Sequence, residues 1–536
     1  MTKLVSSDHK GASILVAQLV TCGLKHAVIS PGSRNAPLTI AFDSHPDITT
    51  HVVIDERSAA HFALGLSLES GIPAAVVCTS GTASLNHGPA IAEAFHHRIP
   101  LISISADRPT SVIEKGHGQS VFQTGVFSKN CKHSILIDEL ELSDEAIIVE
   151  TKKAFDIASS GTSVHINVPF EEPLYSKSEK GELHLIDGSR RITCDFDIPD
   201  ELIGSDAKVL VLGGSLPFYR DCTGLVLSVP GICEKFCGIS GDAVIHSGDM
   251  FLAKNDGCWP DNLIPDFVIT IGTPTLSKAL RNKLIELKPK HYHVSSSGKG
   301  WDTWGGLVKT IECDPKAWLF EFEKRNDINV EYSASWSKVE KHANIDGVSW
   351  SDALAFGIIL NNLPLNTKVH LSNSTSARYI QLIEHPKLLR IHCNRGVSGI
   401  DGCTSTAVGD AIESDGLVIL VSGDVAFLYD INGLASVEEI PSNFKAIVIN
   451  NGGGEIFRWL NGPDEVGLVD KYFETRPRTK VKSAAEYCGL GYFCASDLNG
   501  TKAALSQLIA SDNPAVLEIM TDPITSTEVY KTILRR

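Results

Sequence analysis

Two polar clusters in the last third of the chain directly follow apolar, strand-like runs, and their side chains suit a metal ion. The run LVILVS (417–422) leads into Asp424, and the run KAIVI (445–449) leads into Asn451 and a run of glycines. Mg²⁺ prefers six oxygen ligands in a compact octahedron and keeps phosphate or water among them. We therefore predict that Asp424, Asn451 and the carbonyl of Gly453 hold Mg²⁺ or Mn²⁺, and with it a phosphate group.

Turns offer a simpler explanation for the same residues, since Gly-Asp and Asn-Asn-Gly are common turn sequences. The two clusters are more specific as a pair, because each follows a buried strand and Asn451 lies 27 positions after Asp424. Open α/β sheets bind ligands at the carboxyl ends of their strands. Glycines also let the backbone approach a phosphate closely. The pair therefore favours a ligand site over two unrelated turns.

A carboxylate at another junction between a strand and a helix is a second candidate for chemistry. Glu56 ends the run HVVIDE and begins RSAAHFALG, whose small residues are typical of a packed helix. A carboxylate at a helix N-terminus also interacts favourably with the helix dipole. The residues alone therefore leave a purely structural role for Glu56 open.

Four arginines lie in turn-like stretches near predicted strand ends, namely Arg34, Arg108, Arg378 and Arg395. Guanidinium groups bind carboxylates through two parallel hydrogen bonds. A single arginine of this kind is usually a solvated surface residue. The chain, however, carries a net charge of −16, which would repel small polyanions. Four arginines in matching turns of such an acidic protein therefore predict a local site for anionic substrates.

The elements that must position these residues alternate between apolar β-rich runs and amphipathic stretches, which predicts an α/β fold with parallel sheets flanked by helices. Strands are predicted at 26–30, 51–55, 74–78, 101–105, 266–274, 368–372, 417–422 and 445–449, and helices at 58–70 and 88–97. The run KVLVLGGSLPF (208–218) opens a second unit. Polar stretches at 175–200 and 321–347 separate three domains. We expect these domains to span 1–180, 200–340 and 348–536.

The first and last domains also resemble each other. Ser30 and Ser372 both end a predicted strand, Ser80 and Ser422 both follow or end another, and each pair is offset by 342 residues. A common offset predicts a duplicated α/β domain with an unrelated domain between the copies. The middle domain begins KVLVLGGSLPF and lacks the GxGxxG pattern, which excludes a nicotinamide oxidoreductase of the usual kind.

Composition bounds the remaining possibilities. The 13 cysteines are scattered without CxxC pairs, so we expect reduced, mostly buried thiols rather than a disulfide framework or a zinc site. The acidic balance disfavours nucleic acid and anionic membranes as partners. The sequence has no long apolar run, and we expect a cytoplasmic protein without a signal peptide.

Five motifs resemble those of one enzyme family. SPGSRNAPL (30–38), SADRP (105–109), GHGQ (116–119), SNSTSAR (372–378) and NRGVSGIDG (394–402) are similar to the 2-succinyl-5-enolpyruvyl-6-hydroxy-3-cyclohexene-1-carboxylate synthases, the MenD family. The pair at Asp424 and Asn451 also resembles the signature of thiamine diphosphate enzymes. The resemblance covers the first and last thirds of the chain densely and the middle sparsely. It implies a three-domain thiamine diphosphate-dependent fold, with the pyrimidine ring on the first domain and the diphosphate on the last.

The resemblance also implies a role for each matching residue. Glu56 would be the catalytic carboxylate, set against the aminopyrimidine ring of the cofactor. The cofactor site would consist of Glu56, Ser80, Gly81, Asn86, Ile400, Gly423, Asp424, Asn451, Gly453 and Ile456. The substrate site would consist of Ser33, Arg34, Arg108, Gln119, Lys278, Ser374, Arg378, Arg395, Ile456, Phe457 and Leu460. Asp424, Asn451 and Gly453 would bind the metal.

The activity implied by the family is decarboxylation of 2-oxoglutarate followed by 1,4-addition of the succinyl-semialdehyde carbanion to isochorismate, in menaquinone biosynthesis. A homodimer or a dimer of dimers is implied, with active sites at the subunit interface. The sequence departs from the pattern at Gly118 and Ala279, where some members have Asn and Arg, and at Val425, where many thiamine enzymes have Gly. The alternative is another thiamine diphosphate-dependent 2-oxo acid decarboxylase or synthase. A non-catalytic homologue is disfavoured because Glu56, Asp424 and Asn451 are all present.

Overall fold

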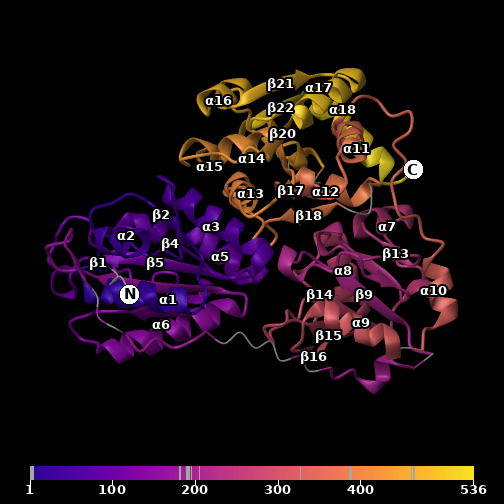
Figure 1. Ribbon diagram of the computed structural model, residues 1–536. Coiled ribbons are helices and arrows are strands. Elements are labelled where there is room, and N and C mark those ends of the chain that lie inside the picture. Colours follow the sequence, from indigo (N-terminus) through magenta and orange to yellow (C-terminus); the bar gives the residue numbers. More distant parts are fainter. Residues whose placement is uncertain are drawn as a thin grey trace. The chain divides into compact units, whose positions relative to one another are not determined.

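The structure, a computed structural model, describes residues 5–179, 181, 183–188, 194, 196–204, 206–325, 327–385, 389–459, 462 and 465–536. Within these residues the chain forms three six-stranded sheets, and every strand pair inside them is parallel. Helices flank the sheets (Figure 1). The predicted α/β class with parallel sheets is therefore confirmed.

The first sheet has the order β3-β2-β4-β5-β7-β6, and α1 and α6 lie on one side of it with α3 and α5 on the other (Figure 1). Its strands are β2 (His26–Ile29), β3 (Thr49–Val52), β4 (Ala74–Cys78), β5 (Leu101–Asp107), β6 (His133–Leu136) and β7 (Ser163–Pro169). Its helices are α1 (Lys10–Thr21), α2 (Ala36–Asp43), α3 (Glu56–Ser70), α4 (Thr82–Asn86), α5 (Gly88–His97) and α6 (Asp144–Ser159). A separate antiparallel pair joins β1 (Val5–Ser7) to β8 (Lys177–Glu179).

The second sheet has the order β13-β11-β9-β14-β15-β16. Its strands are β9 (Val209–Gly213), β11 (Gly231–Cys233), β13 (Val244–Ile245), β14 (Phe267–Ile271), β15 (Lys290–Val294) and β16 (Leu307–Ile311). Its helices are α7 (Gly248–Lys254), α8 (Lys278–Leu287), α9 (Pro315–Arg325) and α10 (Val330–Trp336). A short parallel pair joins β10 (Val226–Leu227) to β12 (Ser240–Gly241).

The third sheet has the order β18-β17-β19-β20-β22-β21. Its strands are β17 (Lys368–Leu371), β18 (Arg390–Cys393), β19 (Val418–Gly423), β20 (Phe444–Asn450), β21 (Gly491–Ala495) and β22 (Ala515–Met520). The helices of this part of the chain are α11 (Asp352–Asn362), α12 (Thr375–Leu382), α13 (Cys403–Ile412), α14 (Asp424–Tyr429), α15 (Asn432–Ala435), α16 (Val481–Tyr487), α17 (Leu498–Ala510) and α18 (Pro523–Ile533). Strands β4, β9 and the first five residues of β19 are buried at every position, as expected for parallel strands covered on both faces.

The first and third sheets share one topology. With strands numbered along the chain, both have the order 2-1-3-4-6-5, whereas the second sheet has the order 3-2-1-4-5-6. The backbone N–H of Ser30 donates to Val77 at 2.9 Å, and that of Ser372 donates to Val421 at 3.0 Å. These matching bonds support the predicted duplication and the equivalence of Ser30 with Ser372.

The second serine pair is not equivalent, which corrects the constant offset of 342. Because Val77 corresponds to Val421, the residue matching Ser422 is Cys78, and Ser80 matches Asp424. The third sheet has two more residues between these strands than the first sheet has. The offset therefore grows to 344 at the strand that carries Asp424.

The strand predicted at 51–55 ends earlier than expected. β3 stops at Val52, and Val53 instead forms an isolated bridge with Val437. The N–H of Ile54 donates to the carbonyl of Ser436 at 3.0 Å. Asp55 then caps α3 by accepting the N–H groups of Arg57 and Ser58. The last residues of the apolar run therefore leave the sheet and carry the chain to Glu56.

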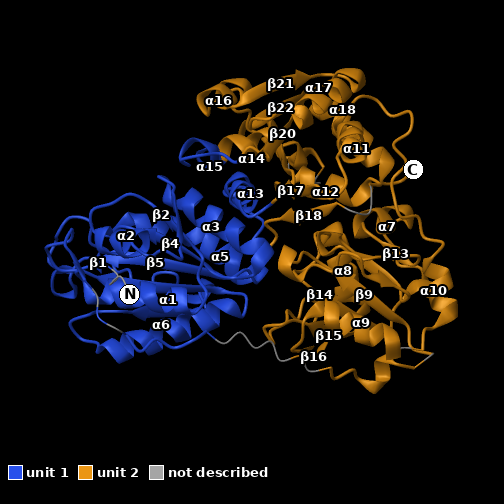
Figure 2. Ribbon diagram, in the orientation of Figure 1, with its two compact units in different colours: residues 1–191, 396–414, 430–441 blue, residues 192–395, 415–429, 442–536 orange. Residues whose placement is uncertain are grey.

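The chain groups into two compact units (Figure 2). Unit 1 contains residues 1–191, 396–414 and 430–441, and unit 2 contains residues 192–395, 415–429 and 442–536. Unit 1 thus takes α13 and α15 from the last third of the sequence. The domain boundaries given above remain a prediction.

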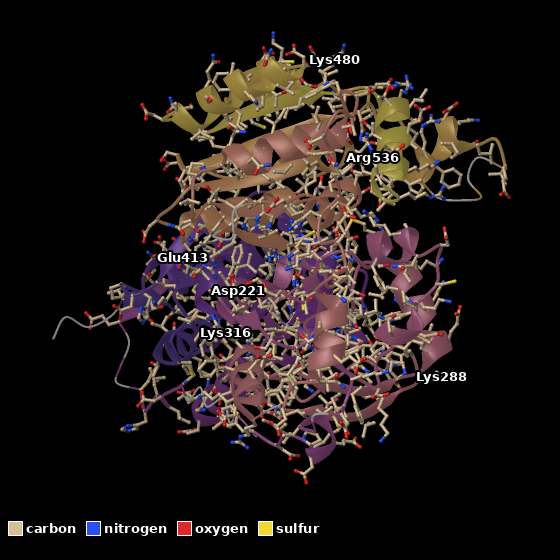
Figure 3. The ribbon with its side chains drawn as sticks, turned by 90° about the vertical axis from the view of Figure 1, so that its right-hand side faces the viewer. Asp221, Lys288, Lys316, Glu413, Lys480 and Arg536 are labelled. Carbon is tan, nitrogen blue, oxygen red and sulfur yellow. A yellow bond between two sulfur atoms is a disulfide. The ribbon has the colours of Figure 1, made fainter. Side chains whose placement is uncertain are left out.

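Exposed charges of unit 2 include Lys288, Lys316, Lys480 and Arg536 (Figure 3). None of the described helices combines the length and apolarity that crossing a bilayer requires.

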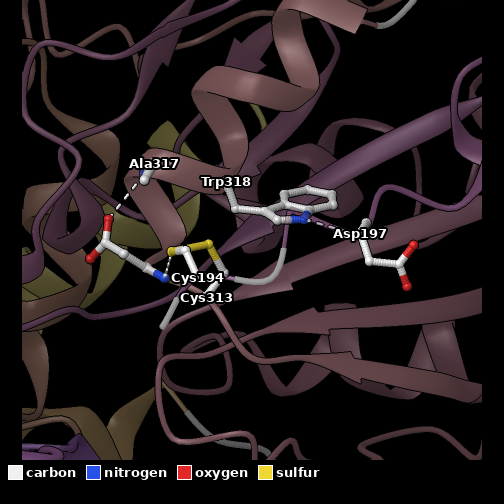
Figure 4. Close-up of a disulfide and its surroundings, with 6 residues drawn as sticks. Cys194, Asp197, Cys313, Ala317 and Trp318 are labelled. Atoms are coloured by element: carbon white, nitrogen blue, oxygen red, sulfur yellow. Dashed lines mark hydrogen bonds between the residues drawn. A yellow bond between two sulfur atoms is a disulfide. The ribbon is translucent and has the colours of Figure 1, made fainter. Parts of the chain in front are cut away.

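One expectation about the cysteines is wrong. Cys194 and Cys313, 119 residues apart, form a disulfide near Trp318, whose indole N–H donates to the carbonyl of Asp197 at 3.4 Å (Figure 4). The other 11 cysteines are free thiols. The spacing of the cysteines does not predict this pair. Cys313 lies between β16 and α9, and tertiary packing brings it to Cys194, 119 residues earlier.

The disulfide predicts a simple thiol count. Unfolded, unreduced protein should titrate 11 thiols, and Cys194→Ser should titrate 12, because the substitution frees Cys313. A matched substitution of the exposed free thiol, Cys258→Ser, should lower the count to 10. The measurement is titration with a chromogenic disulfide in denaturant. Thirteen thiols in the unsubstituted chain would show that the bridge is not formed.

Candidate active site

The candidate metal ligands lie at one edge of the third sheet. β17 is hydrogen-bonded to β19, and β19 to β20, so the residues that follow these strands meet at their carboxyl ends. Asp424 directly follows β19, and Asn451 directly follows β20. The N–H of Gly423 donates to the hydroxyl of Ser372 at 3.3 Å. The strand order reverses between β17 and β19, which is the point where open α/β sheets bind ligands.

The amide of Asn451 is oriented by two carboxyl groups. Its Nδ2 donates to Asp352 at 2.9 Å and to Glu455 at 2.6 Å. Its Oδ1 is buried and has no hydrogen-bond partner among the described residues. A buried acceptor of this kind is costly unless something satisfies it. The orientation of the amide therefore fits a metal ion on its oxygen side.

The two carboxyl groups that bind Asn451, Asp352 and Glu455, are buried and interact with each other. Burial, the charge of Asp352 and a hydrogen bond between the two groups raise the pKa of Glu455 to about 10. Glu455 is therefore protonated at neutral pH. Its Oε1 also accepts from the indole of Trp459 at 3.1 Å. Asp352 accepts hydroxyl hydrogen bonds from Thr521 at 2.6 Å and Ser526 at 3.2 Å.

Asp424 supplies the carboxylate of the predicted set. It is 3 % exposed, and its Oδ1 accepts the N–H of Val425 at 2.9 Å. Burial raises the pKa of Asp424 to about 7, and the charge of Asp352 adds to the rise. A bound divalent cation would offset both effects. One carboxylate, one amide oxygen and one backbone carbonyl suit a hard cation that also binds phosphate.

The glycines after Asn451 form a turn that only glycine fits. Gly452 and Gly453 have φ of 87° and 151°. A Cβ atom on Gly453 would lie 2.4 Å from the carbonyl oxygen of Glu474, whereas a Cβ on Gly452 would meet nothing within 4 Å. The carbonyl of Gly453 accepts the N–H of Glu455 at 3.0 Å and retains a second lone pair.

Two predicted substrate arginines lie at the same sheet edge. Arg378 is in α12, after β17, and its Nη1 donates to the carbonyl of Ser374 at 3.0 Å. Arg395 follows β18, and its Nη1 donates to Asn373 at 2.8 Å. Ser374 has a φ of 77°, a left-handed conformation that is rare for serine. The structure therefore brings Ser374, Arg378 and Arg395 to the edge that carries Asp424.

The remaining predicted residues of unit 2 differ in their exposure to solvent. Lys278 is exposed at the first position of α8, which Ser277 caps. Ile456 and Phe457 are half-buried in a short 3₁₀ helix, and the Phe457 ring lies 5.4 Å from that of Phe473. Leu460, the third member of the predicted apolar wall, lies outside the described residues.

Unit 1 gathers a second group of predicted residues at the carboxyl ends of β2, β4 and β5. Arg34 is buried and donates to the carbonyl of Phe170 at 2.8 Å and to Glu172 at 3.0 Å. Burial and the neighbouring charge of Arg108 lower the pKa of Arg34. Arg108 in turn donates to Gln119 at 3.3 Å. Two guanidinium groups close enough to repel each other make this edge attractive to an anion.

The neighbouring turn carries three predicted cofactor residues. Gly81 has a φ of 89°, and a Cβ on it would come within 3.2 Å of the backbone of Gln119. The hydroxyl of Ser80 is buried and has no partner within the described residues. Asn86 is exposed at the end of α4. Ser33 is exposed next to this group, and its hydroxyl is hydrogen-bonded to that of Tyr175 at 2.9 Å.

Glu56 is the first residue of α3 and is half-buried. Its neighbour Asp55 accepts a hydrogen bond from Asn432 at 2.6 Å, which ties this end of the helix to α15. The charge of Glu56 adds to the burial that raises the pKa of Cys78. Glu56 therefore sits at a fixed helix start, in the first turn of a helix that Asp55 caps.

Comparisons with known proteins agree with this geometry. Residues 9–129 match the N-terminal, and residues 373–519 the C-terminal, thiamine pyrophosphate-binding domain of thiamine pyrophosphate enzymes. The relative from Flavobacterium psychrophilum, a 2-succinyl-5-enolpyruvyl-6-hydroxy-3-cyclohexene-1-carboxylate synthase, is 38% identical over 94% of both chains. Relatives with the same name from Flavobacterium johnsoniae and Bacteroides thetaiotaomicron are 36% and 34% identical, over 95% and 98% of both chains.

The chain belongs to this synthase family. The two matched domains lie in the first and last thirds of the chain, where the sequence resemblance is dense. The roles of the individual residues remain predictions, because the structure places them without showing what they bind.

Sequence reasoning missed three buried carboxyl groups near the predicted sites. Asp352 is 99 residues before Asn451, so no local pattern links the two. Glu455 is four residues after Asn451, in GGGEIF, and this short spacing was an available signal. Glu234 is buried after β11, where burial raises its pKa to about 7 against the opposing charges of Arg395 and Arg378. The carboxylate of Glu234 accepts a hydrogen bond from the backbone N–H of Leu276, two residues before Lys278.

The glycine turn gives a matched pair of substitutions. Gly452→Ala and Gly453→Ala both place alanine at positive φ, a strain on the order of 1–2 kcal/mol. Only Gly453→Ala also forces a Cβ against Glu474. We expect Gly453→Ala to lower the free energy of unfolding further than Gly452→Ala, and to weaken Mn²⁺ binding in the presence of thiamine diphosphate. Urea unfolding and electron paramagnetic resonance of Mn²⁺ measure these effects, and equal behaviour of the two variants would refute the steric explanation.

Proposed function

We propose that this protein is a thiamine diphosphate-dependent 2-succinyl-5-enolpyruvyl-6-hydroxy-3-cyclohexene-1-carboxylate synthase of menaquinone biosynthesis. It would decarboxylate 2-oxoglutarate and join the remaining succinyl-semialdehyde unit to isochorismate by 1,4-addition. The name shared by the full-length relatives supports the reaction. The observation that carries the choice of substrates is the position of Arg378 and Arg395 at the sheet edge that presents Asp424 and Asn451.

The residues of unit 2 fit the diphosphate end of the cofactor. Asp424, the free Oδ1 of Asn451 and the Gly453 carbonyl would hold Mg²⁺ or Mn²⁺, which would bind the diphosphate oxygens. The backbone at Gly423 would lie against the diphosphate, and Ile456 against the cofactor. When bound, thiamine diphosphate supplies the electron sink that makes loss of CO₂ from a 2-oxo acid possible.

The residues of unit 1 fit the ring end of the cofactor. Glu56 would hold a proton between its carboxylate and the aminopyrimidine ring, and this hydrogen bond activates the cofactor. Its place at the start of α3 fixes the backbone from which the carboxylate projects. Ser80, Gly81 and Asn86 would form the turn around the ring. The Ser80 hydroxyl, which is buried and has no hydrogen-bond partner in the part of the chain that the structure describes, supports this assignment. Ile400 would contact the cofactor and help to hold its bound conformation.

The substrates are anions, and the charged side chains suit them. 2-Oxoglutarate is a dianion, and isochorismate carries two carboxylates. Arg378, Arg395, Ser374 and Lys278 would bind carboxylates on one side, and Ser33, Arg34, Arg108 and Gln119 on the other. Binding by several rigid guanidinium groups fixes the orientation of both acids, which is a large part of catalysis in a two-substrate reaction. Ile456, Phe457 and Leu460 would exclude water from the reacting carbon.

We propose a homodimer or a dimer of dimers in which each active site takes residues from two subunits. The support is the set of large apolar side chains exposed around the Glu56 and Gly81 turns of unit 1. Val52, Ile54, Leu85 and Phe122 are 43%, 65%, 46% and 71% exposed. An apolar patch next to a site for charged ligands marks an interaction surface. A cytoplasmic location remains part of the proposal.

Glu56→Gln tests the catalytic assignment. The substitution keeps the size of the side chain but removes the charge that holds the proton. We expect product formation to fall by at least about 100-fold, while the affinity for thiamine diphosphate changes little. The assay follows isochorismate by its ultraviolet absorbance with 2-oxoglutarate, cofactor and Mg²⁺ present. Glu69→Gln, at the other end of the same helix, is the control and should retain activity. Full activity of Glu56→Gln would remove it from this role.

Arg395→Met tests the substrate assignment. Loss of a charged hydrogen-bonding partner should raise the KM for 2-oxoglutarate roughly 10- to 100-fold. Arg390→Met is the matched control, because Arg390 starts the strand that Arg395 follows and pairs with Asp221 at 3.0 Å, away from the carboxyl-end edge. It should leave the KM near its original value. A KM unchanged in Arg395→Met would contradict the anion site.

Isochorismate dependence separates this function from its alternative. CO₂ should be released from 2-oxoglutarate only when isochorismate is present, and its amount should equal the amount of product formed. Release at the same rate without isochorismate would identify another thiamine diphosphate-dependent 2-oxo acid decarboxylase or synthase instead.

A further inference from the structure

A buried carboxylate of unit 1 binds the backbone of the segment that carries Ile400. Glu93 lies on α5 and is 1 % exposed. Its Oε1 accepts the N–H of Gly396 at 2.7 Å, and its Oε2 accepts the N–H of Val397 at 2.8 Å. Each carboxylate oxygen therefore binds one of two consecutive backbone donors. Residues 396–414 belong to the same compact unit as α5 (Figure 2).

Glu93 is held in its ionised form by its surroundings. Burial alone raises its pKa, but the hydrogen bond and charge of His97 and the N–H groups of Val397 and Gly396 outweigh it, so the pKa is lowered. His97 lies one helical turn later, with its Nδ1 at 3.0 Å from Glu93 Oε1. An ionised acceptor makes each backbone hydrogen bond stronger than a neutral one would.

Gly396 lies directly against the helix that carries Glu93. A Cβ on Gly396 would come within 2.6 Å of the backbone carbonyl oxygen of Glu93 and 2.9 Å of the backbone nitrogen of His97. Any side chain at 396 would push the segment away from α5. The glycine therefore brings the two N–H groups within reach of the carboxylate.

The far end of the segment is fixed in a similar way. A Cβ on Gly402 would come within 2.0 Å of the ring of His61, a buried residue of α3. α13 begins at the next residue and packs on α3 through Gly409, whose Cβ would meet the carbonyl of Phe62 at 2.1 Å. Only four residues, 398–401, remain between the two fixed points. Ile400 is one of them, and it is half-buried.

We propose that Glu93 is a positioning residue: by binding the N–H groups of Gly396 and Val397 it fixes the 396–402 segment and so the place of Ile400 against the cofactor. The proposal rests on the proposed function, which gives Ile400 its role. Glu93 touches neither the cofactor nor a substrate in this scheme. Its effect reaches the cofactor through the backbone of the segment.

The test compares Glu93→Gln with a matched control, Glu139→Gln. Glutamine offers one acceptor and one NH₂ group, so it meets one of the two backbone donors with another donor. Glu139 has the same kind of partners, since it accepts the N–H of Gly11 at 2.7 Å and is paired with His9 at 2.6 Å. Neither partner belongs to the 396–402 segment. Glu93→Asp, which keeps the charge but shortens the reach, is a second variant if the first folds poorly.

Two readouts are needed, and the first uses no ligand. Hydrogen exchange of cofactor-free protein should show the amides of Gly396 and Val397 exchanging roughly 10-fold or more faster in Glu93→Gln than in the unsubstituted chain or in Glu139→Gln. The second readout is the affinity for thiamine diphosphate with Mg²⁺, by calorimetry. It should weaken by roughly 10-fold in Glu93→Gln and stay unchanged in Glu139→Gln.

The outcomes separate this proposal from the proposed function. Unchanged exchange at Gly396 and Val397, or a cofactor affinity equal to that of Glu139→Gln, would overturn the positioning role even if the unsubstituted protein binds thiamine diphosphate. Failure of the unsubstituted protein to bind thiamine diphosphate would overturn the proposed function itself, and with it the role of Glu93 toward the cofactor.

Discussion

The parallel pairing of β17 with β19, and of β19 with β20, is the constraint on which the candidate metal site depends. The residues that follow these strands are far apart in the sequence, and only the shared carboxyl-end edge brings Ser374, Asp424 and Asn451 together. A slip of one residue in this register would turn every side chain to the opposite face. The strands are buried on both sides, so such a slip would also disrupt the packing of their side chains against the helices on each face. Packing of the sheet therefore enforces the geometry of the site.

Within that edge, buried charge decides how each polar group is used. The protonated Glu455 and the carboxylate of Asp352 hold the amide nitrogen of Asn451, which leaves the amide oxygen free. The same burial raises the pKa of Asp424 to about 7, so this carboxylate gains most from a cation. An acidic protein can thus favour a divalent metal at one point without a cluster of charged ligands. The packing of the surrounding sheet offsets the free-energy cost of burying these polar groups in a fixed orientation.

Local patterns in the sequence predicted four strands of the first sheet, one of the second and three of the third, because apolar runs followed by glycine or polar residues mark strand ends in parallel sheets. They did not identify the remaining strands. They could not predict partners brought together by tertiary packing, such as Asp352 with Asn451 or Cys194 with Cys313. The repeat was visible in Ser30 and Ser372, but its offset changed by two residues where connection lengths differ. Only the paired register could reveal that change.

The passage from Arg395 to Gly396 joins the two kinds of constraint. Arg395 is hydrogen-bonded to Asn373 in the third sheet's unit, while Gly396 is hydrogen-bonded to Glu93 in the first sheet's unit. Consecutive residues of one loop therefore take their positions from different parts of the fold. A loop free at either side would have to be ordered by ligand binding, at the cost of affinity. Anchoring would hold Arg395, a proposed substrate residue, on one unit and Ile400, a proposed cofactor contact, on the other before any ligand binds.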